Sequence, residues 1–519
     1  MFRKVMSATL VGVNCIPVQV EADVRNGLPG FSMVGYLSSR VREAQERVST
    51  ALKNSGFSFP AKHITVNLSP ADVKKDGTGF DLPIAAVLLS ALGYLDFACL
   101  ENVCMAGELS LSGEIRGIKG ILPIVDRAIK EKCCLCIIPK ENAKEVEMID
   151  EIPILAVENI REFTDYAVLK NWGAVRNPTK KWPETVYKCE CDFCEIAGQE
   201  AAKEAAVIAA AGFHNLLMIG TKGSGKTMIA KSIPGIFPSL SKEEAMEISG
   251  IYCAAGLLSQ ENPIMKTRPF RTPHHTASPK ALAGGGHIPR PGEITLAHKG
   301  ILFLDELPEF SRNTLEILRQ PLEEHKISIS RVSGSFQFPA DFLFVAAMNA
   351  CPCGYYPDRN KCSCSDTDVA KYMGKISGPI LDRFDLCTEM KQVPREQLQK
   401  LKKGKTTKEL REMVKEVHNI QKERYQGQEV SFNGRLQGQE IEKYCETSLE
   451  GEKLLKRAYE KMHLSVRAYH KILKTARTIA DLEKSEKIEV SHISKAVSYR
   501  ALGKKAWYWR KNDRRNLEM

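Results

Sequence analysis

Three short apolar runs in the central part of the chain predict buried β-strands. They cover residues 215–219, 301–304 and 342–348, and each leads directly into a glycine-rich or polar segment. Apolar runs of this length, bounded by turn-forming or polar residues, are typical of strands inside a covered sheet. Each predicted strand is therefore followed directly by a segment whose residues could form part of a functional site.

Helical patterns surround these strands. Residues 82–95 form the longest apolar stretch, which begins beside a proline and is too short to span a membrane, so they predict a buried helix. Residues 38–52 are amphipathic, and residues 327–338 alternate around a glycine in the manner of a β-hairpin. Near the C-terminus, Ser465 is placed to cap a helix. The apolar face of that helix consists of Ala468, Ile472, Leu473, Ala476, Ile479 and Ala480.

The patterns predict an α/β protein with three structured parts and a linker. Residues 1–165 mix alternating strand-like runs with amphipathic helices, which predicts an α+β domain. Residues 166–187 have no clear period and are interpreted as the linker. Residues 188–387 are expected to form a nucleotide-binding core, and residues 388–519 a helical lid with a basic tail.

Composition sets broad limits on this protein. A hydrophobic content of 43% in 519 residues supports sizeable cores in more than one domain. No apolar stretch reaches the roughly 18–20 residues of a membrane helix, and the N-terminus lacks the apolar region of a signal peptide. We therefore expect a cytoplasmic protein without a membrane partner, in which the 16 cysteines stay reduced or bind metal.

The formal net charge of +11 is concentrated towards the C-terminus. Residues 388–519 contain 31 basic and 19 acidic side chains, so the preceding part of the chain is close to neutral. This bias favours a polyanionic partner such as nucleic acid, although a solvated helical face has the same composition. The basic segment 504–515 includes Trp507 and Trp509, which suit stacking on bases or packing on the lid.

The first predicted strand leads into a phosphate-binding loop. Residues 220–227 match the pattern G-x-x-x-x-G-K-[ST], and a helical segment follows at residues 228–232. In this context the backbone N–H groups surround phosphate oxygens, the lysine reaches the β- and γ-phosphates, and the hydroxyl binds Mg²⁺. The motif predicts ATP and Mg²⁺ binding by Gly220, Gly223, Ser224, Gly225, Lys226 and Thr227.

The other two strands end at residues that suit ATP hydrolysis. Asp305 is placed to hold the same Mg²⁺ as the loop threonine, and Glu306 to orient or activate the attacking water. Asn349 can hold that water near the γ-phosphate. Arg383 follows an apolar turn and suits stabilisation of transition-state charge across a subunit boundary. Arg467, at the start of the capped helix, can reach the phosphates from the lid.

Six longer stretches carry a family resemblance: 268–276 (RPFRTPHHT), 284–286 (GGG), 289–294 (PRPGEI), 304–310 (LDELPEF), 348–354 (MNACPCG) and 477–482 (RTIADL). With them the sequence resembles the magnesium-chelatase-like AAA+ ATPases of the YifB/ComM family over essentially its whole length. The resemblance implies an AAA+ P-loop module that assembles as a hexameric ring. It also implies that Lys226 and Thr227 belong to Walker A, Asp305 and Glu306 to Walker B, Asn349 to sensor 1, Arg383 to the arginine finger and Arg467 to sensor 2.

The family pattern also implies two further elements of the ring. An insertion in the second helix is expected near residues 281–292, and the hairpin at residues 327–338 lines the pore in related motors. Lys326 and Arg331 are then candidate contacts to a DNA backbone, or solvated hairpin charges. One departure is Lys222, which stands where relatives usually have proline and adds charge beside the phosphates.

The sequence contains two sets of potential metal ligands. The pairs Cys351/Cys353 and Cys362/Cys364 could bind Zn²⁺ tetrahedrally through four thiolates, or remain reduced thiols that shape the loop after sensor 1. His274 and His275 are adjacent. On an extended segment they would face opposite ways, so we expect a structural or pore-lining use rather than a shared metal.

The N-terminal part resembles the proteolytic domain of Lon, a ribosomal S5 domain 2-like fold, over residues 63–140. Residues 74–81 align with the loop that holds the nucleophilic serine in Lon, but Gly79 or a neighbour occupies that position and no serine is present. The partner lysine corresponds to Lys119. A Ser–Lys dyad without its hydroxyl has no nucleophile, so we expect a non-catalytic domain that forms the ring or contacts DNA.

These observations favour an ATP-hydrolysing ring motor that acts on DNA, with helicase or branch-migration activity in recombination or natural transformation. A chelatase-like or protein-remodelling ATPase is the alternative, although the Lon-like domain is absent from chelatase motor subunits. The missing serine argues against an ATP-dependent protease. The full set of hydrolytic residues argues against a scaffold that binds ATP only as a structural ligand.

Overall fold

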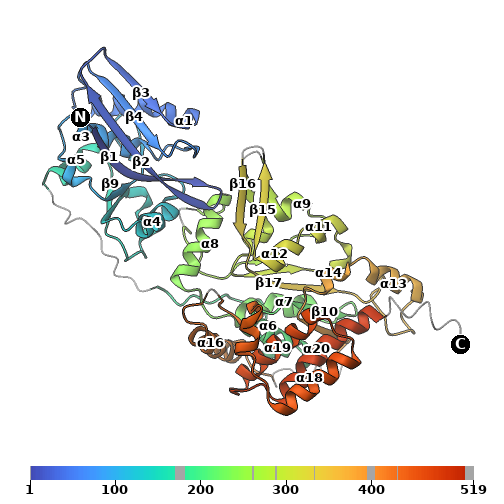
Figure 1. Cartoon of the computed structure of the whole chain (residues 1–519). Coiled ribbons are helices and arrows are strands. Elements are labelled where there is room, and N and C mark those ends of the chain that lie inside the picture. The colour runs from blue at the N-terminus through green and yellow to red at the C-terminus, as the bar shows by residue number, and fades with distance from the viewer. Residues whose placement is uncertain are drawn as a thin grey trace. The chain divides into compact units, whose positions relative to one another are not determined.

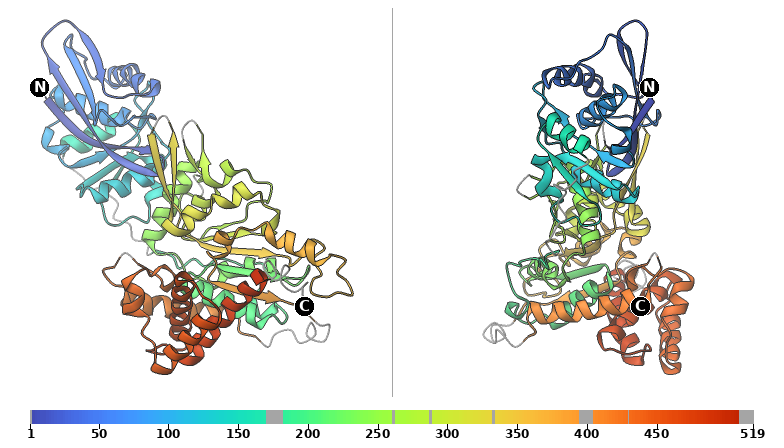
Figure 2. Two further views of the ribbon diagram at one scale, coloured as in Figure 1. Left: turned by 45° about the vertical axis from the view of Figure 1, so that its right-hand side comes forward. Right: turned by 90° about the vertical axis from the view of Figure 1, so that its left-hand side faces the viewer.

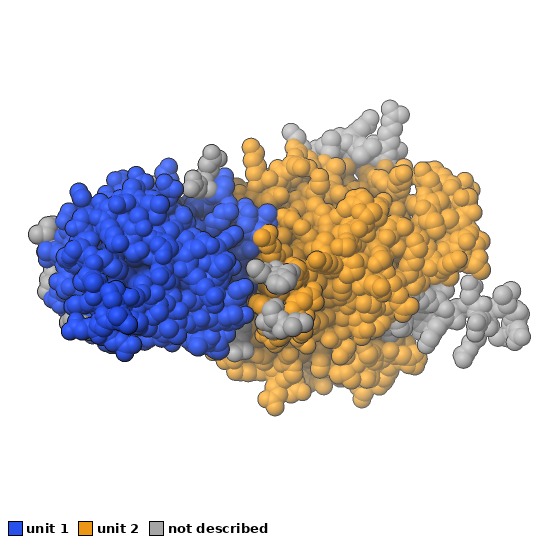
Figure 3. All heavy atoms as spheres, turned by 90° about the horizontal axis from the view of Figure 1, so that it is seen from above, with its two compact units in different colours: residues 1–183, 241–265 blue, residues 184–240, 266–519 orange. Residues whose placement is uncertain are grey.

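The chain divides into two compact units (Figure 3). Unit 1 comprises residues 1–183 and 241–265, and unit 2 comprises residues 184–240 and 266–519. None of the helices described is long and apolar enough to cross a membrane. The computed structural model describes residues 2–169, 182–259, 262–286, 289–331, 334–393, 404–428 and 430–508, without the side chains of 169, 334 and 501–508.

Unit 1 is built on a seven-stranded mixed sheet in the order β3-β4-β2-β1-β5-β8-β9. Its strands lie in the blue to teal part of the ribbon (Figure 2). β1 and β2 pair antiparallel along their full length, and β5, β8 and β9 extend the sheet in parallel. The mixed sheet agrees with the α+β domain expected from the sequence. The strands are β1 (Phe2–Val11), β2 (Asn14–Arg25), β3 (Gly30–Val34), β4 (His63–Ser69), β5 (Val103–Met105), β8 (Leu135–Pro139) and β9 (Ile154–Val157), with a small ladder of β6 (Glu108–Leu109) and β7 (Ile115–Arg116).

The helices of unit 1 include the predicted buried helix and one helix, α8, from a later part of the chain. α3 packs on β1 and β2 and is buried along its whole length, as its apolar sequence predicts. α8 packs on α4 although the sequence placed it in the nucleotide-binding core, so the chain re-enters unit 1 between two segments of unit 2. The helices are α1 (Ser39–Arg42), α2 (Ala44–Asn54), α3 (Asp81–Ala91), α4 (Ile121–Lys130), α5 (Ile160–Leu169) and α8 (Lys242–Ala255).

Unit 2 contains a five-stranded parallel sheet in the order β11-β14-β17-β10-β18. The three predicted central strands are β10, β14 and β17, and nearly all of their residues are buried because helices cover both faces. Parallel pairing brings the carboxyl ends of all five strands to the same edge. The strands are β10 (Leu216–Gly220), β11 (Phe270–Arg271), β14 (Ile301–Leu304), β17 (Leu343–Met348) and β18 (Leu386–Met390).

The C-terminal helices form a lid beside α6 (Figure 1). The predicted capped helix is α19: Ser465 Oγ accepts a hydrogen bond from Ala468 N at 3.2 Å, and the predicted apolar face is buried. Trp507 and the segment 509–515 of the predicted basic tail lie outside the described side chains. The helices are α6 (Glu200–Gly212), α7 (Lys226–Ser232), α16 (Thr407–Arg424), α17 (Gln439–Tyr444), α18 (Leu449–Lys461), α19 (Val466–Leu482) and α20 (Val490–Tyr508).

Two hairpins project from the core of unit 2. β15 (Lys326–Arg331) and β16 (Gly334–Pro339) form the predicted hairpin, with alternate residues of β15 buried. β12 (Gly284–Gly285) pairs with β13 (Arg290–Pro291) inside the expected insertion. The short helices of this region are α9 (Pro279–Ala283), α10 (Glu293–Leu296), α11 (Arg312–Glu316), α12 (Arg319–Glu324), α13 (Asp366–Gly374) and α14 (Gly378–Leu381).

A buried polar network joins the sheet of unit 2 to the lid. His214 is fully buried, and its Nε2 lies 2.7 Å from Thr478 Oγ1 of α19. Asp385 accepts a hydrogen bond from Asn215 N and forms an ion pair with Lys471 of α19, each at 2.9 Å. Burial lowers the pKa of His214 from its ordinary 6.5 to about 3, so the imidazole is neutral in the folded protein at neutral pH.

The neutral His214 predicts that unit 2 loses stability on acidification. Between pH 6.5 and about 3 the unfolded chain binds a proton at this residue and the folded chain does not. The free energy of unfolding therefore decreases as the pH is lowered through this range. From pH 7 to pH 5 this amounts to about 2 kcal/mol. Urea unfolding of wild type and His214→Asn at both pH values should show a shallower acid decline in the variant.

The matched control is His463→Asn, because His463 is exposed and its left-handed φ of 44° suits asparagine. It should retain the acid decline of the wild type. An identical decline in His214→Asn and wild type would contradict the assignment.

Candidate functional site

The phosphate-binding loop lies between β10 and α7, at the carboxyl edge of the parallel sheet. Gly223 and Gly225 adopt φ of 74° and 89°, the left-handed region that glycine tolerates best. A Cβ added to either glycine would meet no atom within 4 Å, so the concave side of the loop is open. Within the described part of the chain, the buried hydroxyls of Thr221 and Ser224 have no hydrogen-bond partner. The loop therefore fits a polyphosphate, which would supply acceptors.

Lys226 is held across this loop. Its Nζ donates to Gly220 O at 2.9 Å, to Thr221 O at 2.8 Å and to Asn349 Oδ1 at 3.1 Å. Burial lowers the pKa of Lys226, and the nearby carboxylates of Asp305 and Glu306 oppose that shift. A buried ammonium with only neutral oxygens as direct partners is suited to an incoming anionic group.

A hydroxyl and a carboxylate suited to Mg²⁺ lie next to Lys226. Thr227 Oγ1 donates to Asp305 Oδ2 at 2.7 Å, so the first turn of α7 and the end of β14 meet. Both oxygens are hard donors of the kind that Mg²⁺ prefers. Their separation shows that one ion could contact both, directly or through water, after a small rearrangement.

Glu306 is held in a left-handed conformation immediately after Asp305. Its φ is 51°, a conformation that costs a non-glycine residue about 1–3 kcal/mol. The backbone N–H of Glu306 donates to Asp305 Oδ1 at 2.9 Å, which helps to hold this turn. The Glu306 side chain is exposed beside the loop, where it can reach a water molecule.

His275 is a neighbour of Glu306 that the sequence did not reveal. Its Nδ1 lies 3.8 Å from Glu306 Oε2. The expectation that His274 and His275 face opposite ways was wrong, since their ring centroids lie 4.1 Å apart. The segment is a turn rather than a strand: Ala277 N donates to His274 O at 2.8 Å. His275 is thus placed to influence the orientation of the Glu306 carboxylate.

The two arginines expected to contact phosphate lie at the opposite edge of the sheet. Asn215, which precedes β10, donates from Nδ2 to Arg383 O at 2.9 Å. The Arg383 guanidinium forms an ion pair with Glu323 of α12, and Arg467 Nη1 lies 3.4 Å from the same carboxylate oxygen. β10 runs five residues, or about 16 Å, from this edge to Gly220. Neither arginine therefore lies beside the chain's own P-loop.

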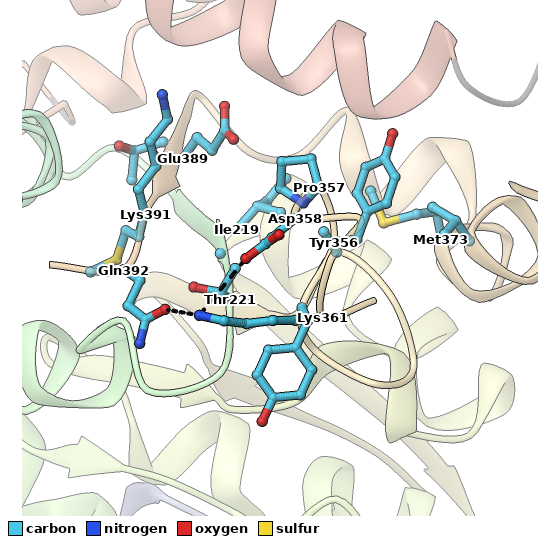
Figure 4. Close-up of a pocket in the computed structure, with 16 residues that line it drawn as sticks. Ile219, Thr221, Tyr356, Pro357, Asp358, Lys361, Met373, Glu389, Lys391 and Gln392 are labelled. Carbon is cyan, nitrogen blue, oxygen red and sulfur yellow. Dashed lines mark hydrogen bonds and ion pairs between the residues drawn. The ribbon is translucent and has the colours of Figure 1, made fainter. Parts of the chain in front are cut away.

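A cavity of about 530 Å³ borders the phosphate-binding loop (Figure 4). Thr221 lines it from the loop, Tyr356 and Lys361 from the segment after β17, and Glu389 and Lys391 from the end of β18. Gly220 also lines the cavity, whereas Lys226, Thr227 and Asp305 do not. The cavity is therefore a neighbour of the phosphate cradle rather than the same site.

Comparisons with known proteins identify the family. Three family models match: "Magnesium chelatase, subunit ChlI" over residues 192–398, "Subunit ChlI of Mg-chelatase" over 20–142, and "Magnesium chelatase, subunit ChlI C-terminal" over 404–500. The chain is 42% identical to "Competence protein ComM" of Haemophilus influenzae over 505 residues, covering 96% of this chain and 97% of the relative. It is 40% identical to "Uncharacterized protein YifB" of Escherichia coli over 493 residues, covering 95% and 96%.

The chain belongs to the ComM/YifB family of magnesium-chelatase-like AAA+ proteins. The resemblance seen in the sequence is therefore confirmed. The five-stranded parallel sheet and the P-loop lie within residues 192–398, and most of the C-terminal helices lie within residues 404–500.

Unit 1 of this ComM/YifB-family chain retains Lon similarity without the Lon nucleophile. "Lon protease 2" of Bacillus subtilis is 30% identical over 146 residues, covering 28% of this chain and 25% of the relative. A Cβ on Gly79 would lie 3.0 Å from Ile118 Cδ1, next to the exposed Lys119, so the two segments aligned with the dyad lie side by side. Gly79 supplies no hydroxyl, which fits the expected non-catalytic role.

The predicted cysteine set converges in space. Cys351, Cys353, Cys362 and Cys364 place their sulfur atoms within 4.8 Å of one another, directly after the Asn349 position. The spacing of the two C-x-C pairs was the only sequence signal for this cluster. It is found in the loop between β17 and α13.

Glu306→Gln is predicted to separate ATP binding from hydrolysis. The amide keeps the size of the side chain but loses the negative charge that would activate water, so turnover should fall by about 10²-fold or more. Affinity for Mg²⁺–ATP should stay near that of the wild type. Nucleotide titration and steady-state phosphate release measure the two quantities.

The control for this variant is Glu309→Gln, which changes an exposed glutamate three residues further along the same loop. It should hydrolyse ATP at close to the wild-type rate. Normal turnover in Glu306→Gln would refute the role given to Glu306.

Proposed function

We propose that the protein is an ATP-hydrolysing ring motor of six subunits that acts on DNA. The observation that carries this proposal is the separation of two sets of residues within one subunit. Lys226, Thr227 and Asp305 gather at the carboxyl edge of the sheet, whereas Arg383 and Arg467 share Glu323 at the other edge. A subunit arranged in this way needs a neighbour to complete each ATP site.

Within one subunit, the P-loop would bind the phosphates and Mg²⁺ would neutralise part of their charge. Thr227 and Asp305 are the residues placed to hold that ion. Glu306 would orient or activate the attacking water, and Asn349 would hold that water while it contacts Lys226. In this proposal the residues of one subunit bind the phosphates and Mg²⁺ and activate the water. None of them stabilises the negative charge that develops on the γ-phosphoryl group in the transition state.

The missing positive charge would come from the adjacent subunit. Arg383 matches the family's arginine finger and Arg467 its sensor 2, and both point to one carboxylate, Glu323. Release of either arginine from Glu323 would free a guanidinium for the neighbour's γ-phosphate. ATP binding in one subunit and ion pairing in the next would thus be coupled.

The two hairpins of unit 2 support action on DNA. A Cβ on Gly285 would lie 3.1 Å from Arg331 Nη2, so the insertion and the β15–β16 hairpin lie together. Lys280, Arg290 and Lys326 are also exposed in this region. Such a group of basic side chains is suited to a phosphate backbone without reading sequence. The name of the Haemophilus influenzae relative, a competence protein, supports a role in natural transformation or recombination.

A chelatase-like or protein-remodelling activity is the second candidate. The family model is described as a magnesium chelatase subunit, and the same AAA+ machinery would serve either substrate. The decisive experiment is steady-state ATP hydrolysis with and without single-stranded and four-way-junction DNA, with Glu306→Gln as the blank. Strong stimulation by DNA supports the motor, whereas robust hydrolysis that ignores DNA supports remodelling of a protein partner.

Complementation between two inactive variants should reveal action between subunits. Arg383→Ala lacks the donated arginine and Lys226→Ala lacks productive ATP binding, so each is expected to be inactive alone. In mixed rings, an intact P-loop from the first would meet an intact Arg383 from the second, and phosphate release should reappear. The control mixture combines Arg383→Ala with a double variant that carries both Lys226→Ala and Arg383→Ala. It should show no phosphate release, because neither subunit then has an intact Arg383. Equal inactivity of both mixtures would contradict donation between subunits.

Lys326→Ala combined with Arg331→Ala should weaken DNA binding in a salt-dependent way. The salt exponent is the magnitude of the slope of the logarithm of the binding constant against the logarithm of the salt concentration. Each lost phosphate contact is expected to reduce it by about 0.7 on single-stranded DNA. Fluorescence anisotropy across a salt series measures this exponent. Lys408→Ala, an exposed lysine of the lid helix α16, is the control and should keep the wild-type exponent. An unchanged exponent in the double variant would remove the hairpin from the DNA surface.

A further inference from the structure

The loop after β17 folds into a compact four-cysteine cluster. Cys351 and Cys362 are buried, and Cys353 and Cys364 are half-buried. The Sγ atom of Cys351 lies 3.3 Å from that of Cys353 and 3.7 Å from that of Cys362, and the latter two are 3.5 Å apart. Among the described residues, this is the one group of three or more potential metal ligands gathered so closely.

These separations are those of ligands around one metal ion. A tetrahedral Zn²⁺ with Zn–S bonds of about 2.3 Å places its sulfurs about 3.8 Å apart. A disulfide requires a sulfur separation of about 2.05 Å, much shorter than any pair here. The cluster therefore matches a tetrathiolate site and not a pair of disulfides.

The surroundings of the sulfurs also suit bound thiolates. Tyr356 N donates to Cys351 Sγ at 3.3 Å, the kind of backbone hydrogen bond that stabilises a metal-bound thiolate. Arg359 Nη1 donates to Cys364 O at 2.9 Å, and its guanidinium also pairs with Asp366. Four thiolates around a divalent ion leave a net negative charge, which the Arg359 guanidinium partly offsets.

The cluster is tied to the ATP site on two sides. Asn349, which accepts a hydrogen bond from Lys226, lies two residues before Cys351. Gly354, which directly follows Cys353, accepts a backbone hydrogen bond at 2.9 Å from Lys222 of the P-loop. A Cβ at Gly354 would lie 3.1 Å from Lys222 Cβ, so the cluster and the P-loop are in close contact.

We propose that Cys351, Cys353, Cys362 and Cys364 bind one structural Zn²⁺ that fixes the sensor 1 loop against the P-loop. The 17 residues from Asn349 to Ser365 form a loop without helix or strand, and a metal bound by its four cysteines would hold that loop in one conformation. Metal binding is independent of the proposed function. Only the effect on turnover rests on the proposed ATPase.

Metal content of the full-length protein tests the site directly. Elemental analysis of purified wild type should give one zinc per chain, and cobalt substitution should give the absorption bands of a tetrahedral tetrathiolate. Cys353→Ser combined with Cys364→Ser should lose the zinc. Cys134→Ser, a change at an exposed cysteine of unit 1, is the control and should keep it. Wild type without zinc, or with iron in its place, would overturn the assignment.

The positioning role is tested by turnover and by rescue. Loss of zinc should lower kcat for ATP by about 10-fold or more, because Asn349 and the P-loop lose their shared support. Cys353→His retains a zinc ligand and should keep both zinc and kcat, whereas Cys353→Ser should lose both. Zinc-free variants with wild-type kcat would overturn the positioning role. A wild type that binds zinc but does not hydrolyse ATP would instead refute the proposed function and leave the metal site standing.

Discussion

The parallel direction of the five strands in unit 2 is the constraint on which the rest of the ATPase region depends. Ladder hydrogen bonds align β10 with both β17 and β18, so all carboxyl ends meet at one edge. Lys226, Asp305 and Asn349 reach that edge from three different strands. Arg383 stands before β18 and is fixed at the other edge through Asn215. The parallel strand order thus separates the residues proposed to bind nucleotide from the arginines proposed to act in a neighbouring subunit.

The buried network around Asp385 links this sheet to the lid. Burial alone would raise the pKa of Asp385, but the ammonium of Lys471 holds it below its usual range, so the carboxylate remains charged. The same carboxylate accepts a hydrogen bond from the backbone of Asn215, which also binds Arg383. Lid helix α19, the amino end of β10 and the backbone of Arg383 therefore share one set of interactions. In the proposed ring, movement of the lid would therefore shift Arg383, the residue proposed to act at the ATP site of the next subunit.

Unit 1 is similar in sequence to part of Lon protease 2, and a buried ion pair stabilises its fold. Asp81, in the segment aligned with the Lon serine loop, is fully buried and accepts two hydrogen bonds from Arg47, at 2.8 and 3.0 Å. Burial raises the pKa of Asp81, and Arg47 opposes that shift. These contacts do not depend on a hydroxyl at Gly79 or at a neighbouring position. The helix α8, which the chain inserts into unit 1 from the middle of the ATPase region, adds a covalent link between the two units.

The sequence by itself determined the three central strands of unit 2, the P-loop, the capped helix α19 and the β15–β16 hairpin, because each depends on residues close together in the chain. Apolar periodicity, left-handed glycines and a capping serine act over a few positions only. Tertiary structure alone decided that Arg383 and Arg467 meet at Glu323, that His275 lies beside Glu306, and that α8 joins unit 1. These contacts link segments tens to more than a hundred residues apart, and their positions follow from sheet order and packing rather than from local pattern.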